Sequence, residues 1–132
     1  MRKTIIGFTL SALLLALCSL SEAQQPKKVP RIGYLSGNFP SSIASRTEAF
    51  RQGLRDLGYV EGKNIVIEYR YGEGKLERLP TLAAELVRLK VDVIVTVGPA
   101  STRPAKEATV AIPIVMAQVN DPVGNGFVAS LA

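Results

Sequence analysis

The run Val91-Asp92-Val93-Ile94-Val95-Thr96-Val97 is the strongest indication of fold class in this 132-residue chain. Nearly every residue in it is apolar and β-branched, and Gly98-Pro99 ends it. A strand with one wet face alternates apolar and polar residues, whereas an almost continuous apolar run is typical of a strand buried on both faces of a parallel sheet. Residues 91–97 therefore predict an interior strand of an α/β domain.

Strands and helices are expected to alternate around this run. The expected strands are residues 31–36, 65–71, 91–97 and 113–117, and the expected helices are residues 43–57, 78–89 and 100–109. Residues 127–132 begin a further element. This order predicts an α/β fold, a parallel sheet with helices on both faces.

The first expected helix has clear boundaries. Ser41 and Ser42 can cap its start, and Gly58 suits a left-handed residue just past its end. Its apolar face is predicted to carry Ile43, Phe50, Leu54 and Leu57.

Prolines limit where the other two helices begin. Pro80 fits only the first turn of a helix, so the second helix should start near Arg78. Pro104 is expected in the first turn of the third helix for the same reason.

The strand expected at residues 65–71 differs from the interior run because it alternates. Ile65, Ile67, Tyr69 and Tyr71 should face one way, with charged residues between them facing the other. One wetter side makes this a candidate edge strand.

The first 23 residues have the pattern of a secretory signal peptide. Arg2 and Lys3 precede an apolar run that ends at Leu17, and Ser21-Glu22-Ala23 resembles a cleavage site. We expect an exported, periplasmic protein with a signal peptide over 1–23, a linker over 24–30 and a domain over 31–132.

Two alternatives remain open for this leader. It could stay attached as an anchor, or Cys18 could be a lipid-attachment site, although the bulky Leu17 before it is unusual for lipidation. Cleavage after Ala23 is the preferred interpretation.

Composition argues against catalysis and nucleic-acid binding. The chain has no histidine and a single cysteine, which lies in the leader, so His-based triads and thiol nucleophiles are excluded from the domain. The net charge of +5 is mild and its basic residues are scattered among acids. We expect no enzyme activity, no cofactor, no metal and no nucleic-acid partner.

Three loops should carry the function, because ligands of parallel sheets bind beyond the carboxyl ends of the strands. These loops are residues 36–40, 98–102 and 118–122. Their polar side chains and helix starts suit a small polar solute. The candidate ligand-binding residues are Ser36, Gly37, Asn38, Ser101, Thr102, Asn120 and Asp121. Ser101 and Thr102 could instead cap a helix, and Asn38, Asn120 and Asp121 could be ordinary turn residues.

Seven segments, in order, resemble one family. They are residues 31–36, 50–59, 64–70, 79–87, 91–96, 112–117 and 121–124, including Phe50-Arg-Gln-Gly-Leu-Arg-Asp-Leu-Gly-Tyr and Ile112-Pro-Ile-Val-Met-Ala. The chain is similar to ABC transporter substrate-binding proteins related to tryptophan- and tyrosine-binding proteins. This resemblance implies a type I periplasmic-binding-protein fold, in which two Rossmann-like lobes close on a solute and deliver it to a membrane permease.

The resemblance also implies which residues contact the ligand. The loops after strands one, three and four of this lobe correspond to Ser36-Gly37-Asn38, to residues 99–102 and to Asn120-Asp121. Relatives often have Gly-Thr or Gly-Gly where this chain has Gly98-Pro99, which leaves the solute open.

Length is the second departure from the family pattern. The chain covers four strands of one lobe, so we expect an N-terminal fragment whose fifth strand and second lobe are missing. An extracytoplasmic sensory module and a nonfunctional truncated product remain alternatives.

Overall fold

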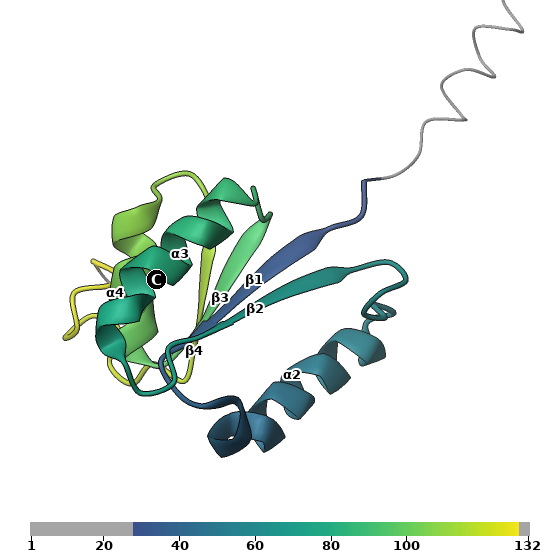
Figure 1. The fold of residues 1–132 in the computed structure, drawn as a ribbon, viewed down its shortest axis with the longest axis horizontal. Coiled ribbons are helices and arrows are strands. Elements are labelled where there is room, and N and C mark those ends of the chain that lie inside the picture. The colour runs from purple at the N-terminus through teal and green to yellow at the C-terminus, as the bar shows by residue number, and fades with distance from the viewer. Residues whose placement is uncertain (1–27, 130–132) are drawn as a thin grey trace, which may run out of the picture.

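The computed structural model describes residues 28–129 and consists of one sheet with helices on both sides (Figure 1). The expected signal peptide over 1–23, Cys18 and residues 130–132 lie outside the described residues. The elements, in order, are β1 (Arg31–Ser36), the 3₁₀ helix η1 (Pro40–Ile43), α2 (Ala44–Asp56), β2 (Val66–Tyr71), the 3₁₀ helix η2 (Leu76–Arg78), α3 (Leu79–Arg88), β3 (Val93–Val97), α4 (Pro99–Ala108) and β4 (Ile114–Ala117).

The four strands are all parallel and lie in the order β2-β1-β3-β4. Ser36 of β1 lies opposite both Tyr71 of β2 and Val97 of β3, and Val97 in turn lies opposite Ala117 of β4. The carboxyl ends of all four strands therefore meet at one edge. The predicted α/β class is confirmed, and β2 is the edge strand that its alternation indicated.

Helices α3 and α4 cover one face of the sheet (Figure 1). A buried cluster joins the two helices to the sheet: Leu35, Leu79, Leu82, Ala83, Leu86, Val91, Ile94 and Ala105. A Cβ placed on Gly33 in β1 would lie 3.0 Å from Leu86 Cδ1, so the missing side chain lets α3 approach the centre of the sheet.

Helix α2 covers the opposite face, where aromatic rings fill the core. Tyr34 of β1 is 2% exposed, and its ring centroid lies 5.3 Å from that of Phe50 and 5.5 Å from that of Tyr69. Tyr69 and Tyr71 stack on each other with an interplanar angle of 3°. Ile65, Ile67, Tyr69 and Tyr71 all pack on this side, which confirms the predicted facing of the β2 residues.

The start of the first helix differs from the prediction. Ser41 and Ser42 do not cap α2: they lie in η1, and the Ser42 hydroxyl donates back to the Phe39 carbonyl at 2.8 Å. Leu57 is 76% exposed rather than packed, because α2 ends at Asp56 and Gly58, with a φ of 90°, turns the chain away. The expected left-handed residue at Gly58 is confirmed.

The later helices show one agreement and one error. Helix α3 begins at Leu79 with Pro80 in its first turn, as expected. Helix α4 begins at Pro99, so Pro104 lies inside it rather than in its first turn.

The described part of the element expected from residue 127 contains no helix or strand, although Phe127 is 5% exposed. Within residues 28–129, no helix is long and apolar enough to span a membrane.

Candidate functional site

The order of the strands places a rim of loops at one edge of the sheet. The chain leaves β1 first toward β2 on one side and then returns to β3 on the other, so strand order reverses between β1 and β3. Ligands of open parallel sheets bind beyond the carboxyl ends of the strands at such a reversal. We define the rim as residues 36–40, 98–102 and 118–122, the three loops that the sequence singled out.

The loop after β1 offers Asn38 to solvent. Ser36 is fully buried, and its hydroxyl oxygen accepts the backbone N–H of Asn38 at 3.2 Å. The carbonyls of Ser36 and Gly37 accept the N–H groups of Gly72 and Gly74, both at 2.8 Å, which ties this loop to the one after β2. Ser36 therefore holds the loop in position, while Asn38 is exposed.

The loop after β3 is built around hydroxyls that point inward. Ser101 and Thr102 have no exposed surface. The Ser101 hydroxyl donates to the Val97 carbonyl at 2.8 Å, and the Thr102 hydroxyl donates to the Gly98 carbonyl at 2.9 Å. Neither side chain caps α4, whose N-cap is Gly98. In this lobe these hydroxyls fix the junction between β3 and α4 and do not reach the rim surface.

The loop after β4 is exposed and contains strained backbone. Asn120 and Asp121 are both exposed. Gln118 and Asp121 have φ values of 59° and 49°, a left-handed region that non-glycine residues enter at some cost. Asp121 Oδ1 accepts the Gly124 N–H at 2.8 Å, so the carboxylate also closes the turn. Strain of this kind gathers at binding sites and loops that must hold one shape.

The structure thus divides the predicted residues into two groups. Gly37, Asn38, Asn120 and Asp121 lie at least partly open at the rim, whereas Ser36, Ser101 and Thr102 lie beneath it. The sequence could not separate these groups, because hydroxyls beside a strand end look alike whether they point inward or outward.

One rim feature was missed by the sequence. Arg46 of α2 and Gln118 border a small cleft of about 50 Å³ between α2 and the ends of β3 and β4. Gln118 belongs to a predicted rim loop, but Arg46 gave no signal beyond lying off the apolar face of its helix. Its guanidinium places a positive charge beside this end of the sheet.

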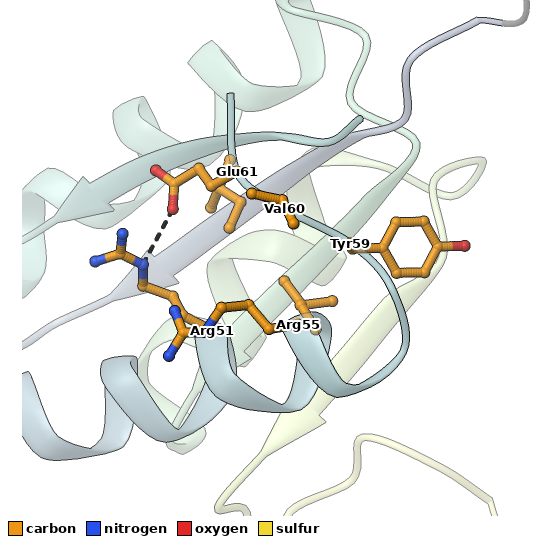
Figure 2. Close-up of a pocket in the computed structure, with 7 residues that line it drawn as sticks. Arg51, Arg55, Tyr59, Val60 and Glu61 are labelled. Atoms are coloured by element: carbon orange, nitrogen blue, oxygen red, sulfur yellow. Dashed lines mark ion pairs between the residues drawn. The ribbon is translucent and has the colours of Figure 1, made fainter. Parts of the chain in front are cut away.

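A second cavity lies at the start of β2, at the opposite end of the sheet from the rim (Figure 2). Arg51, Arg55, Tyr59, Val60 and Glu61 line it together with two apolar residues, and its volume is about 90 Å³. Ligand pockets for small organic molecules measure roughly 300–1,000 Å³. This cavity, like the smaller cleft beside Arg46, is too small to enclose an amino acid.

The charges of that second cavity are already paired. Arg51 Nε lies 3.1 Å from Glu61 Oε2, which also accepts the Tyr69 hydroxyl at 2.9 Å. Arg55 Nη2 lies 2.6 Å from Glu48 Oε1, and this hydrogen bond lowers the pKa of Glu48 below its ordinary value. The cluster is a structural network that joins α2 to β2.

Residues that commonly bind metals do not gather in the described part of the chain. Over residues 28–129, no group of three or more His, Cys, Asp or Glu side chains is arranged to hold a metal ion. The rim instead presents amide groups, a carboxylate and the start of a helix, groups that can form hydrogen bonds with a small polar molecule.

The fold and rim define an α/β lobe of the kind that binds ligands at the carboxyl ends of parallel strands. Residues 39–132 match the family described as "ABC transporter substrate binding protein". The chain is also 33% identical, over 105 residues, to a tyrosine-binding protein of Clostridioides difficile (strain R20291), covering 80% of this chain and 30% of that protein. This chain belongs to the ABC transporter substrate binding protein family.

Solved structures agree with this assignment. One is a ligand-free, open substrate-binding protein with adhesive properties from Clostridium difficile, with 27% identity, a TM-score of 0.73, and 78% of this chain and 35% of that one covered. Another is an ABC domain in complex with L-Trp from Streptococcus pneumonia, with 25% identity, a TM-score of 0.73, and 79% and 35% covered. The chain thus spans about a third of the length of these relatives.

Proposed function

We propose that this chain is the N-terminal lobe of an extracytoplasmic solute-binding protein that serves an ABC-type uptake system. The lobe captures an amino acid or small organic anion, which a membrane permease then receives. One observation carries the proposal: in a member of a substrate-binding family, exposed polar residues flank the point where the strand order reverses. A tyrosine-binding relative and a neighbour bound to L-Trp support amino acids as the solute class.

The rim chemistry fits a zwitterion. The Asp121 carboxylate suits an ammonium group, and the amides of Asn38 and Asn120 can donate and accept hydrogen bonds. The first turn of α4 leaves backbone N–H groups without partners in the helix, which suits a carboxylate. Ser36, Ser101 and Thr102 belong to the proposed site as the residues that set the positions of its loops.

The proposed role is capture without catalysis. No activated nucleophile stands at the rim, and binding alone requires only complementary polar groups. A second lobe that closes over this rim is part of the proposal, because enclosure removes water from a bound solute and strengthens each polar contact.

Calorimetric titration of the protein that carries both lobes with L-Tyr and L-Trp tests this function. We expect heat from the wild-type protein and an affinity about tenfold weaker for Asp121→Asn, since a hydrogen bond to a charged group contributes at least a decade in Kd. Glu107→Gln, which removes an exposed carboxylate on α4 outside the rim, is the matched control and should bind like the wild type. The absence of heat with any amino acid or small organic anion would overturn the proposal.

The proposed location follows from the leader over residues 1–23, the linker over 24–30 and the lobe from residue 31 onward. Intact-mass measurement of the protein from its native source tests it. Loss of residues 1–23 supports an exported protein that is free in the periplasm, whereas a mass with lipid on Cys18 supports a tethered one. A mass that retains the whole leader without lipid would contradict both.

A further inference from the structure

Two cations of α4 reach the turn that follows the rim residues Asn120 and Asp121. The Arg103 guanidinium lies over the ring of Phe127, 5.5 Å from its centroid, and its Nη2 donates to the Asn125 carbonyl at 3.3 Å. The Lys106 ammonium donates to the Phe127 carbonyl. Phe127 is 5% exposed although most of its neighbours are exposed, so the ring acts as the anchor of this turn.

A chain of hydrogen bonds continues from this anchor to the rim. The Asn125 amide donates to the carbonyls of Asn120 and Asp121, both at 2.9 Å. The backbone N–H of Asn125 also donates to the Asp121 carbonyl at 3.0 Å, and the N–H of Phe127 donates to the Pro122 carbonyl at 2.9 Å. Residues 120–127 therefore form one closed turn, and α4 contacts it at residues 125 and 127, the end of the turn that lies away from the rim.

The turn needs such an external hold. Asp121 has a φ of 49°, and a non-glycine residue in this region persists only where the surrounding structure over-determines it. Charge-assisted hydrogen bonds to carbonyls are stronger than neutral ones. Among the described residues, neither Arg103 nor Lys106 forms an ion pair, so their charges act on the turn.

We propose that Arg103 and Lys106 are positioning residues that hold the 120–127 turn against α4 and thereby fix Asn120 and Asp121 for solute capture. The second half of this statement rests on the proposed function. Helix α4 begins in the rim loop after β3, and its Arg103 and Lys106 donate hydrogen bonds to the turn that continues the loop after β4. The helix therefore links two of the three rim loops. A solute that orders one of these loops then meets the other already in place.

Hydrogen exchange of the free protein tests the hold without any ligand. Arg103→Gln and Lys106→Met should speed exchange at the amides of Asn125 and Phe127 by about tenfold, because local opening loses a charge-assisted hydrogen bond. Lys106→Arg should leave the exchange of both amides at the wild-type rate, since it keeps a positively charged donor. Arg88→Gln on α3, a loss of an exposed cation elsewhere, is the control. Unchanged protection in both variants, with β1 amides protected as in the wild type, would overturn the proposal.

Titration with L-Trp and L-Tyr tests the link to capture. If the wild type binds, both variants should bind about tenfold more weakly, with Lys106→Arg close to wild type, because the open turn must be ordered on binding. Faster exchange with unchanged affinity would overturn the positioning role. If the wild type itself shows no heat, the proposed function fails, and the exchange experiment still decides whether the two cations hold the turn.

Discussion

The two margins of the sheet are built in opposite ways. At the β2 margin, charged side chains cross between elements: Arg70 lies 2.9 Å from Glu85 of α3, and Arg51 of α2 lies 3.1 Å from Glu61. At the β4 margin, the strand Ile114–Ala117 carries no charge, and Val115 is 53% exposed. From residue 93 to residue 129 no ion pair forms.

The two edge strands differ in how well they are protected from pairing with another chain. Natural edge strands are protected by charged residues, which discourage pairing with other chains. Strand β2 follows that rule, whereas β4 offers an unpaired, apolar edge within the described residues. A mainly apolar groove, whose lining includes Ile112, Ile114, Met116 and Phe127 together with Lys106 and Thr109, runs beside it. Among the described residues, the β2 margin carries the charged side chains that oppose strand pairing, and the β4 margin lacks them.

The largest expected effect separates the aromatic core between β1, β2 and α2 from the β4 margin. Tyr34→Ala should lower the free energy of unfolding by about 3–5 kcal/mol, because it leaves a cavity among three rings. Val115→Ala should change it by less than about 0.5 kcal/mol, as expected for a half-exposed side chain. Urea unfolding of both variants measures this, and similar losses would show that Val115 is packed as tightly as the aromatic core.

A smaller effect is expected at the junction that leads to the β4 margin. Gly98 has φ 84° and ψ 167°, a conformation almost restricted to glycine, so Gly98→Ala should destabilise the protein by about 1–3 kcal/mol. A new Cβ there meets no atom within 4 Å, so the loss reports backbone strain alone.

The matched control for this strain is Gly53→Ala in α2, where a Cβ also meets open space. The backbone there is helical, so alanine should stabilise the protein by about 0.4–1 kcal/mol. Thermal unfolding of the two variants should therefore move the Tm in opposite directions. Shifts of the same sign would contradict the strain at Gly98.

The exposed edge itself should show in self-association rather than in stability. We expect the wild-type chain to associate as its concentration rises, and Val115→Lys to abolish this, since a lysine on an edge strand opposes pairing. The free energy of unfolding of the Val115→Lys variant should differ from that of the wild type by less than about 0.5 kcal/mol. Sedimentation velocity is the measurement. Val66→Lys on β2 is the control, and equal effects of both lysines would remove the contrast between the edges.

The smallest expected effect is a pH dependence confined to the β2 margin. Burial, and the hydrogen bond from its hydroxyl to Glu61, raise the pKa of Tyr69 above its ordinary value of 10.0. The unfolded chain therefore loses this proton first, so the stabilisation is complete below about pH 10 and declines as the pH rises further. Between pH 9 and pH 11 the wild type should lose stability more steeply than Tyr69→Phe. Equal slopes would contradict the raised pKa.

The sequence predicted most of the fold because its signals were local. The apolar run over 91–97 indicated an interior strand, and the alternation over 65–71 indicated an edge strand with Tyr69 and Tyr71 facing together. Both patterns indicate which sides of a strand are buried, because a shift of one residue would move every apolar side chain to the opposite face. The incorrect predictions concern helix ends: the Ser42 hydroxyl donates to the Phe39 carbonyl instead of capping α2, and Leu57 is exposed instead of packed.

The candidate site was predicted less completely. The sequence located the three rim loops, but it could not show that Ser101 and Thr102 point into the β3–α4 junction while Asn120 and Asp121 stay exposed. That division depends on how α4 packs on the sheet. Contacts across the fold leave no mark in the local pattern.

The local sequence pattern was enough to predict a parallel α/β lobe and the residues at which its strands end, because burial imposes a period on each segment. The contacts of Arg103 and Lys106 with the turn beyond Asp121 could not be predicted in this way, nor could the different exposure of the two margins. Arg103 lies 22 residues from Asn125 along the chain. Such a contact exists only after the helix has packed on the sheet, since packing brings distant segments to hydrogen-bonding distance.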